Sequence, residues 1–112
     1  MPTEIFSKRK PLGTSLKDFI ITRIEFDRSQ KKLVSFSVLQ VHSPGEANYE
    51  VIKYDTAHGH CHVHRFYRTL DDKGEKLKGK NISQATFDEC RQDLKENWEK
   101  YKRLYADKWL KN

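Results

Sequence analysis

The sequence predicts an α+β fold: a four-stranded antiparallel β-meander with one long C-terminal amphipathic helix packed on one face. Two patterns predict it. Apolar and polar residues alternate through much of residues 16–68, which is typical of half-buried strands. From residue 83 onward the apolar residues recur every three or four positions, which is typical of one helix face. A chain of 112 residues is long enough for one domain and too short for two.

The alternating region, expected to form the β-meander over residues 16–68, divides into four strands joined by short links. They are expected at residues 16–27, 32–41, 49–54 and 60–68. Polar residues separate the first two, and a Pro-Gly pair precedes the third. Short connections between successive strands favour an antiparallel meander.

Two segments lack such a pattern. Residues 1–14 carry Lys8-Arg9-Lys10 and little apolar periodicity, so we expect a flexible basic N-terminal arm, either simply solvated or contacting phosphates. Residues 69–82 are rich in charge and glycine, and we expect a loop there.

The C-terminal helix is expected over residues 83–110, with Ser83 as its N-cap. One apolar stripe comprises Phe87, Leu94, Trp98, Tyr101, Tyr105 and Trp109. Trp98 and Tyr101 lie in the middle of it and are expected to pack against the sheet. Replacing Trp98 by alanine should then lower the free energy of unfolding by about 3 kcal/mol or more.

Composition and charge limit the functional classes. The net charge of +6 favours an anionic partner, with nucleic acid the obvious one, although many basic proteins use such a charge only for solubility. The sequence has no apolar run of about 18 residues and no secretory signal at its start, so we expect no membrane partner and a cytoplasmic location. Cys61 and Cys90 have no metal-site or disulfide-framework spacing and are expected to be reduced core residues.

Histidines mark the candidate site. Four of the five fall at every second position from His58 to His64. Alternate side chains of a strand point to opposite faces, so these four would share one face while Cys61 and Val63 point to the other. We expect the histidines on the sheet face that the helix leaves open.

One interpretation is a metal site. A turn centred near Ala57 would put Ile52 opposite His62 and Glu50 opposite His64. His62, His64 and Glu50 would then form a two-histidine, one-carboxylate set for a divalent metal such as zinc.

A second interpretation is acid–base catalysis without metal, and a third is a plain solvated or hydrogen-bonded histidine face. Cleavage of RNA by its 2′-hydroxyl needs a base, an acid and a cation near the phosphate. The histidines considered for proton transfer are His60, His62 and His64. Candidate substrate-binding residues are Lys53, Arg65, Arg68 and Tyr54, the last by stacking on a base, although Arg65 is expected on the opposite face.

The run from Val51 to Tyr54-Asp55, followed by a His-x-His at His60 and His62 or at His62 and His64, and then by an amphipathic helix, resembles the TumE-like toxins of toxin–antitoxin systems. The resemblance covers about half of the chain, from Val51 onward, and its motifs are short. The additional histidines and the Trp- and Lys-rich helix end depart from the pattern, which a neighbouring family on the same scaffold could share. The resemblance implies a small cytoplasmic protein with an antitoxin-like protein partner and an action on RNA.

Three functional hypotheses therefore stand: an RNA-directed nuclease, a metal-binding protein and a non-catalytic interaction module. We expect replacement of His62 by alanine to abolish activity or metal binding, and replacement of His42, which is remote in sequence, to leave it largely intact.

Overall fold

The computed structural model describes residues 3–111, and describes His58 by its backbone alone. Its six strands form one antiparallel sheet in the order β1-β2-β3-β4-β5-β6, so each strand pairs with its neighbours in sequence. Their bounds are β1 Glu4–Pro11, β2 Asp18–Asp27, β3 Lys32–His42, β4 Tyr49–Asp55, β5 His62–Arg65 and β6 Glu75–Lys76. The expected α+β class and meander are confirmed, but the expected number of four strands is wrong.

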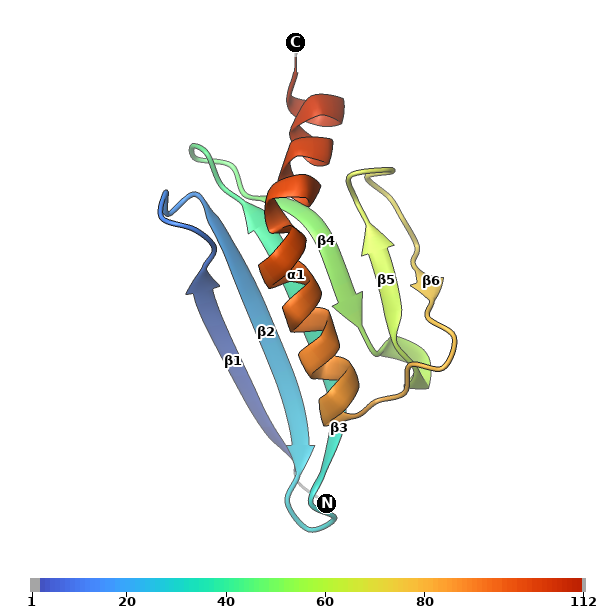
Figure 1. Ribbon diagram of the computed structural model, residues 1–112. Coiled ribbons are helices and arrows are strands. Elements are labelled where there is room, and N and C mark those ends of the chain that lie inside the picture. The colour runs from blue at the N-terminus through green and yellow to red at the C-terminus, as the bar shows by residue number, and fades with distance from the viewer. Residues whose placement is uncertain (1–2, 112) are drawn as a thin grey trace.

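The two added strands are at the edges of the sheet (Figure 1). Strand β1 forms within the segment expected to be a flexible arm, pairing from Glu4↔Phe26 to Pro11↔Phe19. Its residues are mostly exposed, so backbone pairing rather than an apolar pattern specifies it. Strand β6 is two residues long and lies within the segment expected to be a loop. Neither strand has the apolar alternation that predicts a strand from sequence.

The α-helix α1 (Gln84–Tyr105) lies over β3 and β4 on one face of the sheet (Figure 1). Ser83 caps it as expected, because its side-chain oxygen accepts a hydrogen bond from the Thr86 backbone N–H at 3.1 Å. The helix buries a stripe against the sheet that includes Phe87, Cys90, Leu94, Tyr101 and Tyr105. The α-helix ends earlier than expected, and Ala106–Leu110 form a π-helical segment, η2.

The core lies between α1 and the sheet. Phe36, Val38, Ile52 and Val63 are almost completely buried there and meet the helix stripe. Trp98 packs against this cluster and Tyr101 belongs to it, as expected from the stripe. Within residues 3–111, no helix is both long and apolar enough to cross a membrane.

Candidate functional site

The register of β4 and β5 decides which side chains accompany the histidines. Val63 lies opposite Tyr54, whose hydroxyl donates to Asp93 on α1 at 2.7 Å, so both point toward the helix. His62 and His64 therefore point to the face away from α1. The expected division is confirmed for these residues, because Cys61 and Val63 belong to the core beneath the helix. The expected row of four histidines on one strand is wrong, since β5 begins at His62 and excludes His58 and His60.

The expected register itself is wrong. His62 lies opposite Asp55 and His64 opposite Lys53, because the turn is longer than expected and contains the 3₁₀ helix η1 (Ala57–Gly59). A shift by an odd number of residues exchanges the two faces of one strand relative to the other. Asp55 therefore lies opposite His62, where Ile52 had been expected.

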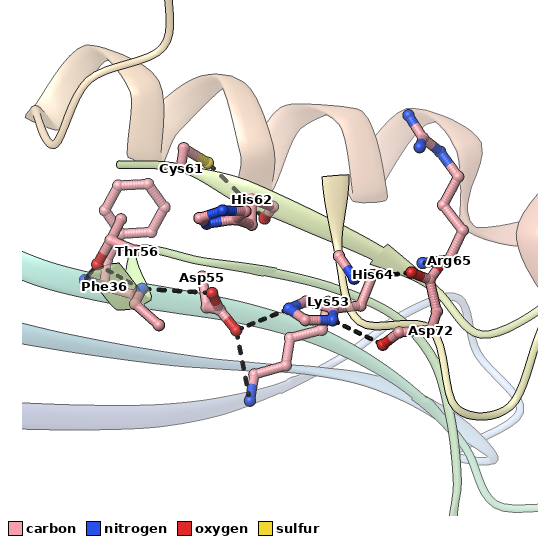
Figure 2. A network of polar contacts seen from close by, with 11 residues as sticks. Phe36, Lys53, Asp55, Thr56, Cys61, His62, His64, Arg65 and Asp72 are labelled. Carbon is pink, nitrogen blue, oxygen red and sulfur yellow. Dashed lines mark hydrogen bonds and ion pairs between the residues drawn. The ribbon is translucent and has the colours of Figure 1, made fainter. Parts of the chain in front are cut away.

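His64 is held through both of its ring nitrogens. Its Nε2 lies 3.1 Å from an Asp55 carboxylate oxygen, and its Nδ1 lies 3.0 Å from the Asp72 backbone carbonyl (Figure 2). Both partners only accept hydrogen bonds, so both bonds form together only when both ring nitrogens carry protons. The Lys53 ammonium is 3.9 Å from the same Asp55 carboxylate. His64 is therefore oriented with both ring nitrogens toward acceptors.

A tight turn supports His64 from behind. The Asp72 carboxylate accepts the backbone N–H groups of Arg65 at 2.9 Å and Gly74 at 2.8 Å. Burial alone would raise the pKa of Asp72, but these two hydrogen bonds lower it below its ordinary value. The turn thereby presents the Asp72 carbonyl to His64.

The rings of His60 and His62 lie against each other, with centroids 4.4 Å apart. Both side chains are partly accessible, and both precede the segment held by Asp72. The backbone of His58 lies in η1, and its side chain is outside the described part of the structure. The structure thus brings His60 and His62 into contact, as the sequence hypothesis of an acid–base pair requires.

Two cross-sheet rows contain the histidines. Residues opposite each other in neighbouring strands share a face. The first row is Ser7, Arg23, Ser37, Asp55, His62 and Lys76, and the second is Arg9, Ile21, Leu39, Lys53 and His64. These rows hold four Lys or Arg residues and a single carboxylate. The face away from α1 is therefore predominantly cationic around the histidines; we call these two rows the histidine face.

The candidate substrate-binding residues divide between different places. Lys53 lies on the histidine face, as the acid–base hypothesis requires. Tyr54 faces α1, which corrects the expectation, since its hydroxyl donates to Asp93 in a partly buried contact. Arg65 points to the helix side, as expected (Figure 2). Its guanidinium pairs with Glu75. Arg68 lies in the turn after β5, at the end of the molecule where η2 lies.

The proposed metal set does not assemble as expected. His62 and His64 share a face. The part of β4 that pairs with β5 runs only from Ile52 to Asp55, so Glu50 has no partner in β5. Glu50 lies opposite Val41 of β3 instead. Among the described residues, no group of three or more His, Cys, Asp or Glu side chains is arranged to hold a metal ion.

His42 has a structural role that its remote position in the sequence did not suggest. Its Nδ1 is 2.7 Å from a carboxylate oxygen of Asp18, and Asp18 is 1% exposed. Replacing His42 would leave a buried carboxylate without this partner, so His42→Ala is expected to lose stability and is a poor control.

Asp55, Asp72 and Lys76 are site residues that the sequence analysis missed. The spacing Asp72-x-Gly74 is a signal for an Asx turn and could have indicated the support for His64. No such signal marks Lys76, because β6 has only two residues and no periodicity.

Fold and site together define a small α+β protein with a six-stranded antiparallel meander, one covering helix and a cationic histidine face. Residues 7–111 match the family described as "Domain of unknown function (DUF7718)", and the chain belongs to that family. No curated protein and no solved structure gave a significant match.

Proposed function

We propose that this protein acts on RNA through the histidine face and cleaves it by metal-free acid–base catalysis. The main support is the position of His62 between Asp55 and Lys76 in a row that crosses the whole sheet. The net charge of +6 and the four cations of the two rows suit a polyanion.

The roles follow from the contacts that orient His64 and from the contact between the His60 and His62 rings. Both nitrogens of His64 face acceptors, so we assign it to charge and orientation. His62 takes the proton of a ribose 2′-hydroxyl, whose oxygen then bonds to phosphorus. His60 gives a proton to the departing 5′-oxygen, which leaves a 2′,3′-cyclic phosphate and a 5′-hydroxyl. Lys53 and Lys76 offset the charge on the phosphorane.

The resemblance to TumE-like toxins fits this proposal and adds a biological setting. In that setting, expression of the protein arrests growth, and an antitoxin-like protein relieves the arrest. The short His-x-His motif and the Tyr54-Asp55 pair are the residues on which the resemblance rests.

The first test uses untagged protein, single-stranded RNA and EDTA. We expect cleavage that yields 2′,3′-cyclic phosphate ends, and no cleavage of DNA of the same sequence. His62→Gln should lower the rate by about a hundredfold or more, which is the usual contribution of a general base. Lys95→Gln, an exposed change on α1, is the control and should cleave at the wild-type rate. A fully active His62→Gln protein, or cleavage that EDTA abolishes, would contradict this mechanism.

A second test asks whether the orientation of His64 matters, using two glycines of the same loop region. A Cβ at Gly74 would lie 2.8 Å from His64 Cε1, whereas a Cβ at Gly79 would have nothing within 4 Å. Both residues have positive φ, +97° and +77°, so an alanine strains the backbone at either position. We expect Gly74→Ala to lose much more RNA cleavage than Gly79→Ala, at equal concentrations of folded protein. Equal losses would mean that His64 has no part in the activity.

A further inference from the structure

A second cationic surface lies on the other side of the molecule, where η2 meets the turn after β5. We call it the C-terminal groove. It has a volume of about 570 Å³ and is lined by Tyr67, Arg68, Lys100, Leu104, Asp107 and Lys108. Three of these residues are cations and one is a carboxylate. Its volume falls within the range of roughly 300–1,000 Å³ that is usual for ligand sites.

Aromatic rings accompany each cation. The Arg68 guanidinium lies 5.9 Å from the Tyr67 ring centroid. The ammonium of Lys100 is 5.4 Å from the Tyr101 ring, and that of Lys108 is 5.2 Å from the Trp109 ring. Proteins that bind single-stranded nucleic acid combine cations with aromatic rings, because the cations contact the phosphates and the bases stack on the rings.

The groove is held in shape by contacts between distant parts of the chain. Tyr67 stacks on Tyr101 with centroids 5.5 Å apart and an interplanar angle of 11°. The indole N–H of Trp109 donates to the Phe66 carbonyl at 3.0 Å, and the Lys108 ammonium donates to the Arg68 carbonyl at 2.5 Å. A preformed site loses less conformational freedom when a ligand binds.

The positive charge of the groove is available to a ligand. Within residues 3–111, neither Arg68 nor Lys100 forms an ion pair. Trp109 and Leu104 remain 38% and 42% exposed beside them. Positive charges without ion pairs, next to the exposed Trp109 ring, favour an anionic ligand with flat groups.

We propose that the C-terminal groove binds single-stranded RNA, with its phosphates on Arg68, Lys100 and Lys108 and a base against the aromatic rings. The choice of RNA rather than another anion rests on the proposed function. The groove is distinct from the histidine face, since none of its lining residues belongs to the two histidine rows.

Binding is measured with a short fluorescein-labelled 2′-O-methyl RNA, which has no free 2′-hydroxyl to attack the phosphate. Fluorescence anisotropy gives the affinity across salt concentrations of about 50–200 mM. The Arg68→Gln/Lys100→Gln double variant should bind at least about tenfold more weakly. Its slope of log K against log salt should be shallower by about 1.4, because each contact to a single strand contributes about 0.7.

The matched control is the Lys17→Gln/Lys95→Gln double variant, which loses the same charge from exposed positions outside the groove. It should keep nearly the wild-type affinity. Equal weakening in the two double variants would overturn the proposal, because it would show that total charge alone governs binding.

A second readout identifies the ligand class. The chain has two tryptophans, so Trp98→Phe leaves Trp109, beside the groove, as the single tryptophan excited selectively at long wavelength. RNA should quench its emission saturably, and polyglutamate at equal charge should not. Equal quenching by polyglutamate would mean that the groove takes an acidic protein segment instead.

The two proposals can fail separately. If the groove variant loses binding while no form of the protein cleaves RNA, the catalytic proposal fails and the groove proposal stands. If RNA is cleaved in a His62-dependent way while both double variants bind equally, the groove proposal fails and the catalytic proposal stands.

Discussion

At the scale of single residues, the register between β4 and β5 decides which side chains lie beside the histidines. The sequence predicted that Cys61 and Val63 face the helix, and the structure agrees because alternation within a strand is a local property. Which β4 residues join the histidines depends on the length of the turn, which alternation does not specify. Asp55 and Lys53 therefore stand beside them, and Tyr54 does not.

Asp93 shows where Tyr54 is used instead. Its carboxylate accepts the hydroxyl of Tyr54 at 2.7 Å, the hydroxyl of Tyr101 at 2.9 and 3.0 Å, and the Asn97 amide at 2.8 Å. Burial, together with these bonds to Asp93, raises the pKa of both tyrosines above the ordinary value. A polar cluster of this kind ties β4 to α1 only while the hydroxyls keep their protons.

The cluster predicts a loss of stability in alkali. The pKa values of the two tyrosines are higher in the folded protein than the value of about 10 in an unfolded chain. The stabilisation is therefore complete below pH of about 10 and is lost as the pH rises toward the folded values. Urea unfolding on both sides of that pH should show the decline, with a shallower slope for Tyr54→Phe. An equally steep slope in that variant would mean that other groups cause the alkaline loss.

At the scale of elements, the helix was the part best predicted from sequence. A period of 3.6 residues and an N-cap are local signals, so Ser83 and the stripe from Phe87 to Tyr105 were identified. Trp109, expected on the same stripe, lies in η2 and is exposed. The change to π-helix in η2 was not identified, and no local signal marks the hydrogen bonds of Lys108 and Trp109 to the turn after β5. The strands β1 and β6 were missed for the same reason: their pairing partners, rather than their own sequences, specify them.

Trp98 connects the helix to the link between β1 and β2, and a glycine comparison tests this contact. A Cβ at Gly13 would lie 2.8 Å from Trp98 Cζ2, whereas a Cβ at Gly79 would contact nothing within 4 Å. Both positions have positive φ, +71° and +77°. We expect Gly13→Ala to lower the free energy of unfolding by about 1–3 kcal/mol more than Gly79→Ala, since overpacking has about that cost.

Denaturant unfolding of both glycine variants measures this difference, with Trp98→Ala as the reference. The partly buried indole should contribute about 3 kcal/mol. In the Trp98→Ala background the two glycine substitutions should become nearly equal, because the clash is removed. A difference that persists there would assign the effect at Gly13 to its backbone alone.

At the scale of the whole molecule, the two cysteines join the histidine strand to the helix. Cys61 lies directly before β5, and its Sγ is 4.0 Å from that of Cys90 on α1. Their exposed fractions are 0% and 4%, so the expectation of core positions is confirmed, and both are free thiols. The hydrogen bond between them lowers the pKa of Cys61 and raises that of Cys90. Cysteine labelling can therefore report how the helix and the histidine strand separate.

If the sheet and helix open only together, each thiol should react only through global unfolding. In the single-cysteine variants Cys61→Ser and Cys90→Ser, the remaining thiol should react with a disulfide reagent at least about a thousandfold more slowly than in urea, because folded-to-unfolded ratios of small domains begin near that value. The two rates should scale with the separately measured stabilities of the variants. A Cys61 rate well above this scale would show that β5 and β6 open locally while α1 stays packed on β3 and β4. The histidine face would then be the least stable part of the sheet, as functional segments often are.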